Sequence, residues 1–175
     1  MGAFGELLAS DHRQTLEFFF RGLLDLSEPG VDREEVLYNA SVLAHYAQVS
    51  TRAAFELPAP TDLSTVFDTF VVDASLKRDG LLMETAGAQC LLLTGFFEDQ
   101  MRERHNVHWY SKLGASFFGR AAVHQQTRRK ARLLDRLAVG FEPWRQRHAQ
   151  LSRDLRDQAY LLSARATRSP LADFS

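Results

Sequence analysis

The sequence predicts an all-α protein, folded as a single-domain bundle of about six or seven helices. Apolar residues recur at helical spacing through nearly the whole chain and never alternate for the length of a strand. The 10 glycines and 5 prolines are few and scattered among 175 residues, so they separate long segments instead of marking many short ones. With 45% apolar and 25% charged residues, the chain has the composition of an ordinary globular domain, and its length suits one such domain.

The first two helices are expected on either side of the turn Glu28-Pro29-Gly30. Ser10 is a suitable N-cap for the first helix, because its hydroxyl can accept a hydrogen bond from a free backbone N–H. The second helix is predicted from about residue 32 to residue 54. Its two neighbouring apolar stripes indicate contacts on two sides.

A stiff linker at residues 57–60, where two prolines restrict the backbone, is predicted to precede a third helix. Thr61 or Asp62 caps that helix, and its apolar residues run at helical spacing to Ala74.

The central helix of the bundle is predicted at about residues 80–105, because its middle is apolar on nearly every side. Low exposure is expected from Ala86 to Leu93, and Gly87 and Gly95 would let neighbouring backbones approach closely. The most apolar stretch, residues 81–97, is short for a bilayer span and contains polar residues. We therefore expect no membrane segment.

Three further helices are expected after this central one. Asn106 can cap a helix that runs to about His124 as an antiparallel neighbour of the central helix, and the next helix covers about residues 127–139. The last helix has Pro143 in its first turn. Its inner stripe comprises Trp144, His148, Leu151 and Leu155, and the tail after about residue 168 is expected to fray.

Segments 37–47, 86–97 and 108–114 resemble a group of all-helical bacterial proteins that have a central helix leading into an aromatic pair. The resemblance covers about residues 35–122. It implies the helical fold and transfers no activity, cofactor or site residue, since the shared motifs are mainly packing residues.

A cytoplasmic protein is expected from the single cysteine and from the start of the chain. Cys90 cannot form an intrachain disulfide and lies in an apolar run, as a buried thiol of a reducing compartment would. Residues 1–10 have neither the basic start nor the apolar stretch of a secretory signal. The sequence also has no Gly-rich phosphate loop, no Gly-x-Ser-x-Gly elbow and no Cys-x-x-Cys pair, which removes the usual support for three classes of enzyme or metal site.

His105 and His108 form the sharpest candidate for a metal site, since two imidazoles near a tight turn can face one point. Glu98 or Glu103 could add an oxygen ligand for a divalent transition metal. The alternative, which we favour, is that cationic residues near a helix C-terminus complement the helix dipole and that Glu98 and Arg102 form an ordinary i,i+4 pair. No cofactor is otherwise predicted.

Three other titratable residues are candidates for chemistry, each with a plainer explanation. His45 lies on a polar stripe of the second helix, together with Glu34 and Tyr38. Glu84 could act as a general acid or base if it were buried, but a carboxylate is also favoured near a helix start. His148 is expected to be a core-edge histidine satisfied by hydrogen bonds.

The charge distribution points to an interaction surface. Residues 1–119 carry a net charge of −8 and residues 120–175 a net charge of +7. Arg128, Arg132 and Arg136 repeat every fourth residue and form a basic stripe on one helix. Such a stripe can pair with the acidic half of the chain, with a second subunit or protein partner, or with nucleic acid.

The leading functional hypothesis is therefore a non-catalytic helical interaction or regulatory module that acts through protein–protein contacts or self-association as a homodimer. The first alternative is a small helical enzyme, or a metal- or ligand-binding protein, with its site at His105 and His108. The second alternative is nucleic-acid binding through the basic stripe. The stripe has no interleaved aromatic residues and no recognisable helix-turn-helix, which favours protein over nucleic acid.

Overall fold

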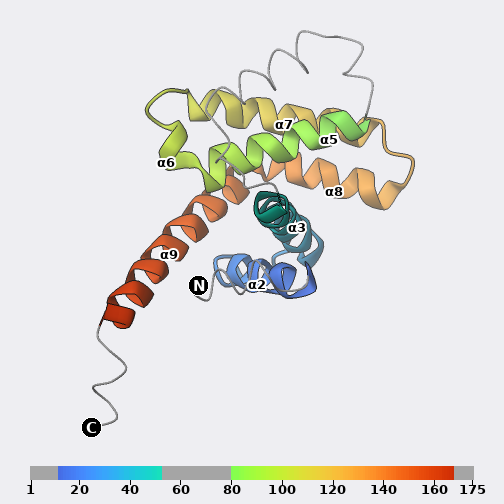
Figure 1. Ribbon diagram of the computed structural model, residues 1–175. Coiled ribbons are helices and arrows are strands. Elements are labelled where there is room, and N and C mark those ends of the chain that lie inside the picture. Colours follow the sequence, from blue (N-terminus) through green and yellow to red (C-terminus); the bar gives the residue numbers. More distant parts are fainter. Residues whose placement is uncertain (1–11, 53–79, 168–175) are drawn as a thin grey trace.

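The computed structural model describes residues 12–52 and 80–167, and the predicted all-α bundle is confirmed (Figure 1). Within these residues every regular element is a helix and there is no strand. The expected cap at Ser10, the linker at 57–60, the helix from residue 61 to Ala74 and the tail after residue 168 lie outside the described residues.

Helices α2 (His12–Asp25) and α3 (Arg33–Arg52) pack against each other and correspond to the first two helices predicted from the sequence. The turn between them contains Gly30 with a φ of 89°, which glycine adopts without the penalty a side chain brings. Asp32 caps α3, because its Oδ1 accepts hydrogen bonds from the backbone N–H of Glu34 at 2.8 Å and of Glu35 at 3.4 Å.

The central helix was predicted to be continuous over about residues 80–105, but the structure interrupts it. The segment consists of α5 (Gly80–Leu91), a π-helical turn η3 (Leu92–Phe96) and the short α6 (Glu98–Met101). In the π turn the N–H of Phe97 donates to the carbonyl of Leu92 five residues back, at 3.1 Å. The extra residue in this turn rotates the start of α6 relative to α5, so that both Phe97 and Glu98 are buried.

The predicted burial of this segment is confirmed except at Ala88, which is partly buried, and at Gln89. Ala86, Cys90 and Leu91 are almost completely buried, as are the residues of η3 up to Gly95. Gln89 is exposed, so α5 is not enclosed on every side.

Helices α7 (Val107–Val123), α8 (Arg128–Val139) and α9 (Phe141–Thr167) complete the described fold. Asn106 caps α7 as predicted, with its side chain accepting from the N–H of Trp109 at 3.1 Å. Helix α7 packs against both α5 and α8. Helix α9 crosses η3 and then runs obliquely away from these helices (Figure 1). Pro143 lies in the first turn of α9, where its missing N–H costs no helical hydrogen bond.

Glycines permit the closest contacts in the core. A Cβ at Gly87 would lie 3.0 Å from the ring of Phe118, and a Cβ at Gly114 would lie 2.5 Å from Cζ of Phe141 and 2.8 Å from Cβ of Cys90. The α5–α7 and α7–α9 contacts are therefore made by backbone against side chain. None of the helices described between residues 12 and 167 has the length and apolarity needed to cross a membrane.

Two glycines of α7 provide a matched test of this packing. Gly114→Ala should lower the free energy of unfolding by about 1–3 kcal/mol, because the new methyl group overlaps Phe141 and Cys90. Gly119→Ala should leave stability unchanged or raise it by up to about 1 kcal/mol, since its nearest neighbour would lie 3.9 Å away and alanine is the better helix former. Urea unfolding measures both; equal stability of the two variants would contradict the close α7–α9 contact.

Candidate functional site

The junction that carries His105 and His108 lies between α6 and α7. His105 is half-buried and packs edge-on against Tyr110, with ring centroids 5.7 Å apart, whereas His108 is exposed in the first turn of α7. In the described part of the chain, no group of three or more His, Cys, Asp or Glu side chains is placed to hold a metal ion. The metal site at these two histidines stays a prediction.

Glu98, one of the two expected oxygen ligands of that site, is the anionic centre of an arginine cluster between α6 and α9. It is 8% exposed, and its carboxylate contacts Arg102 at 2.7 Å, Arg145 at 3.1 Å and Arg153 at 2.9 Å. Burial alone would raise the pKa of Glu98, but hydrogen bonds from Arg102 and Arg145 outweigh it and lower the pKa. The predicted Glu98–Arg102 pair is therefore present as one contact of this larger cluster.

Arg145 links this cluster to the π turn. Its guanidinium donates to the carbonyl of Thr94 at 3.1 Å and to both oxygens of Glu142, at 2.6 and 2.8 Å. Glu142 also accepts from the hydroxyl of Ser111 at 2.8 Å, and the hydrogen bonds from Arg145 are the main cause that lowers the pKa of Glu142 to about 2. Each charged group in this cluster is already paired, so the cluster stabilises the packing of α9 against the π turn and α6.

Sequence reasoning missed Arg145 as a buried residue, although a signal was present. Arg145 lies three residues before His148 and seven before Ser152, on the buried side of α9. Asn39 was also missed, although it lies within the apolar stripe of α3 that includes Val36 and Leu43.

His148 is completely buried, and only one of its two ring nitrogens has a hydrogen-bond partner among the described residues. The expectation of a core-edge histidine with its hydrogen bonds satisfied was therefore wrong. Nε2 of His148 lies 2.8 Å from Oδ1 of Asn39, whose amide nitrogen donates to the carbonyl of Glu35 at 2.8 Å. This arrangement assigns Nε2 as the donor and leaves Nδ1 without a hydrogen-bond partner among the described residues. Burial lowers the pKa of His148 to about 3, so the ring is neutral at physiological pH.

The remaining single candidates are explained by packing. Glu84 accepts from the hydroxyl of Tyr38 at 2.9 Å and pairs with Lys130 at 2.8 Å, which joins α3, α5 and α8. Tyr38 packs against Phe118, so its expected place on a polar face was wrong, while His45 is exposed as predicted. Burial raises the pKa of Cys90 to about 12, as expected for an inert core thiol.

The basic stripe lies on α8, which forms a hairpin with α7. Residues 107–139 contain 7 Lys or Arg and 1 Asp, a net charge of +6. Three of these cations are neutralised within the chain: Arg129 by Glu34, Lys130 by Glu84 and Arg136 by Asp32. The intramolecular complementarity considered from the sequence thus accounts for one edge of α8, and it includes Arg136.

The other four cations of the hairpin have no ion pair with any described residue. These are Lys112, Arg120, Arg128 and Arg132, and all four are exposed. Arg128 and Arg132 lie one turn apart on the outward side of α8, while Arg120 is in the last turn of the adjoining helix. We call these four exposed cations together the hairpin face.

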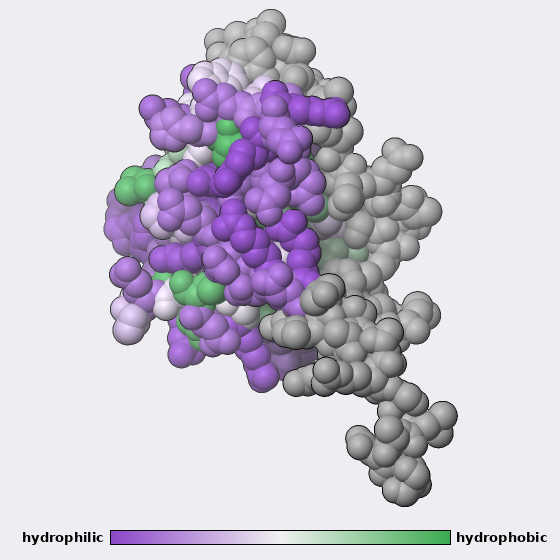
Figure 2. Space-filling model, turned by 90° about the vertical axis from the view of Figure 1, so that its left-hand side faces the viewer, coloured by the Kyte–Doolittle hydropathy of each residue, from purple (hydrophilic) through white to green (hydrophobic). Residues whose placement is uncertain are grey.

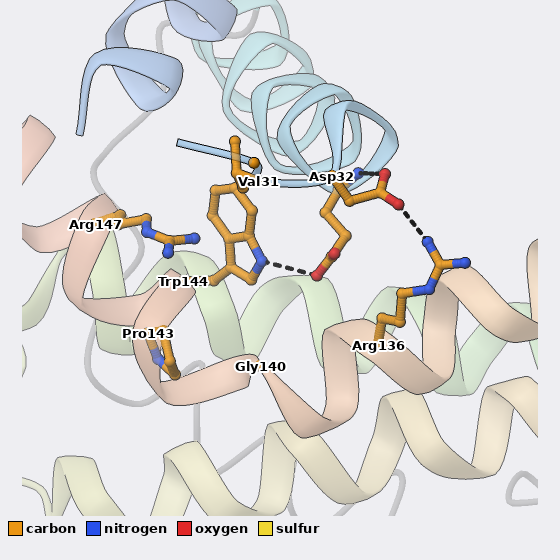
Figure 3. Close-up of a pocket in the computed structure, with 9 residues that line it drawn as sticks. Val31, Asp32, Arg136, Gly140, Pro143, Trp144 and Arg147 are labelled. Carbon is orange, nitrogen blue, oxygen red and sulfur yellow. Dashed lines mark hydrogen bonds and ion pairs between the residues drawn. The ribbon is translucent and has the colours of Figure 1, made fainter. Parts of the chain in front are cut away.

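A pocket of about 450 Å³ lies between the Gly30 turn, the end of α8 and the start of α9 (Figure 3). It is lined by Gly30, Val31, Asp32, Glu35, Arg136, Gly140, Pro143, Trp144 and Arg147. The indole N–H of Trp144 donates to Oε1 of Glu35 at 3.2 Å, and the guanidinium of Arg147 lies 4.4 Å from the centroid of the same ring. The pocket was not predicted from the sequence, because its walls come from three separate segments.

One side of the molecule offers little apolar area. Figure 2 shows the side of the molecule at the left of Figure 1, and the described part of this side is mainly hydrophilic with small apolar patches. Recognition through a broad hydrophobic surface has no support on this side.

Comparison with protein-family models, with curated proteins and with solved structures finds no match. Functional interpretation of the hairpin face and the pocket therefore rests on their own chemistry.

The buried His148 makes stability depend on pH. Its folded pKa lies below that of an exposed histidine, so the unfolded chain binds more protons below about pH 6.5 and folding stability falls as the pH drops toward 3. Between pH 6.5 and pH 5 this single group should cost about 1.5 kcal/mol of unfolding free energy.

Denaturant unfolding at several pH values checks this, with His148→Gln expected to flatten the dependence over that window. His45→Gln is the control, because His45 is exposed. This variant should show the same pH dependence of stability as the wild type. An unchanged slope in the His148→Gln variant would contradict the assignment.

Proposed function

We propose that this protein binds an acidic protein surface through the hairpin face and that it does so without catalysis of its own. The observation that carries this proposal is the set of four exposed cations on α7 and α8 that have no ion pair among the described residues. Neighbouring cations on the same hairpin are paired, whereas Asp135, the acidic residue on this stripe of α8, forms no ion pair with Arg128 or Arg132.

The geometry of the face suits a flat or helical acidic partner. On α8 the exposed positions Arg128, Arg132, Asp135 and Val139 follow one another by four, three and four residues, which places them on a single stripe. Helices α7 and α8 pack side by side and are joined by residues 124–127, so Arg120 lies at the same end of the hairpin as Arg128. Guanidinium groups arranged in this way bind carboxylates through paired hydrogen bonds.

Apolar residues on the hairpin favour a protein over a nucleic acid. Val123 is 80% exposed and Val139 is 89% exposed, one toward each end of the hairpin. Aliphatic side chains contribute to protein interfaces when they are covered, whereas binding of single-stranded nucleic acid relies on aromatic side chains that stack on bases. The exposed stripe of α8 has no aromatic residue, and the exposed aromatic of α7, Trp109, lies near the start of that helix, at the opposite end from Arg120.

Arg136 is better assigned to the fold than to the partner. Its guanidinium pairs with Asp32, the residue that caps α3, so a partner would have to displace an existing ion pair. We therefore propose Arg128 and Arg132 as the principal partner-binding residues, with Arg120 and Lys112 in support.

Charge reversal tests the proposal. Fluorescent poly-L-glutamate serves as a defined acidic polypeptide, and its affinity is measured by polarisation at several salt concentrations. Arg128→Glu with Arg132→Glu should weaken binding at least tenfold at low salt, since two attractive contacts become repulsive. The matched control, Arg21→Glu with Arg104→Glu, makes the same change of charge at exposed sites outside the hairpin and should keep most of the affinity.

Two results would contradict the proposal. Equal loss in the two double variants would show attraction by net charge alone. Tighter binding of a 20-base-pair DNA or a structured RNA, with a steep salt dependence that the hairpin variant abolishes, would assign the face to nucleic acid instead.

A further inference from the structure

The pocket beside α9 has a charge balance that indicates its ligand, and it is separate from Arg128 and Arg132. Four charged residues line it: Asp32, Glu35, Arg136 and Arg147. Asp32 and Arg136 neutralise each other, because one carboxylate oxygen of Asp32 caps α3 and the other pairs with Arg136 (Figure 3). This ion pair forms one wall of the pocket, and its charges are already compensated, so a charged ligand would gain little by binding there.

Arg147 is the uncommitted cation of the pocket. Its guanidinium lies against the Trp144 ring and has no carboxylate partner in the described part of the chain. Contact with an aromatic face orients the guanidinium without using its N–H groups, so these donors stay available for an oxyanion. Figure 3 shows this side chain on the opposite side of the indole from Arg136.

Glu35 is the matching uncommitted anion. One of its oxygens accepts from the indole N–H of Trp144, but no Lys, Arg or His among the described residues forms an ion pair with it. The indole hydrogen bond fixes the position of the carboxylate while its charge remains uncompensated. Trp144 thus holds an anion through its N–H and a cation through its ring.

We infer that this pocket binds a small zwitterion, a molecule that carries an amine and an oxyanion such as a carboxylate or sulfonate. The oxyanion pairs with Arg147 and the ammonium group pairs with Glu35. The aliphatic walls supplied by Val31 and Pro143 receive the carbon skeleton between or beside these groups. A volume of about 450 Å³ is within the range of small-molecule sites and accommodates a free amino acid.

Isothermal titration of the full chain with the twenty free amino acids, taurine and γ-aminobutyrate tests this inference. At least one probe should bind saturably, and its N-acetylated and amidated derivatives, which each lack one charge, should bind at least tenfold more weakly. Arg147→Met and Glu35→Gln should each weaken binding of the parent compound at least tenfold. Arg128→Gln and His45→Gln lie outside the pocket and should leave its affinity unchanged.

Thermal unfolding of each variant confirms that it is folded before titration. The inference is overturned if no probe saturates, if the N-acetylated derivative binds as tightly as its parent, or if Glu35→Gln retains full affinity. Failure of these titrations leaves the proposed hairpin interaction untouched, because its test uses a different surface and a different ligand.

Discussion

Helix α9 passes over η3 at a position where the chain has no side chain. A Cβ at Gly95 would lie 2.8 Å from Cβ of His148 and 3.0 Å from the carbonyl oxygen of Arg145, so the two backbones meet directly. This contact sets the depth at which α9 enters the bundle. It brings Arg145 to the carbonyl of Thr94, and it brings His148 to Asn39 on α3. One close approach therefore joins α3, η3 and α9 through buried hydrogen bonds.

That approach also explains why a carboxylate is tolerated at a position with 8% exposure. Glu98 begins α6, separated from the π turn by one residue, and it meets Arg145 and Arg153 of α9 together with Arg102 from its own segment. A buried charge is costly unless it is paired and hydrogen-bonded, and here both carboxylate oxygens are engaged. The arrangement favours one register of α9 against η3, because a shift along the helix would separate these groups and leave them buried without partners.

Local signals predicted the helices well, and tertiary contacts explain the rest. Asn106 and the Gly30 turn act within a few residues of themselves, so the boundaries they set were predictable from the sequence. The π turn was not, because it depends on a crossing helix more than fifty residues away. The same holds for the pocket, where Glu35 and Trp144 come together from distant segments. The basic stripe was predictable as a pattern, but only the structure separates its paired edge from its unpaired face.

This separation bears on function, because the cations of the unpaired face form no ion pair within the described chain. Arg128 and Arg132 are like charges four residues apart on one helix, an arrangement that destabilises a helix by roughly 0.2–0.5 kcal/mol. Arg128 also begins α8, where the positive end of the helix dipole disfavours a cation. Arg129, Lys130 and Arg136 offset comparable costs by pairing with α3 and α5, whereas Arg128 and Arg132 have no such partner in the described chain. Arg128 is disfavoured on both counts and Arg132 on the first, and this is a physical reason to seek their partner outside the molecule.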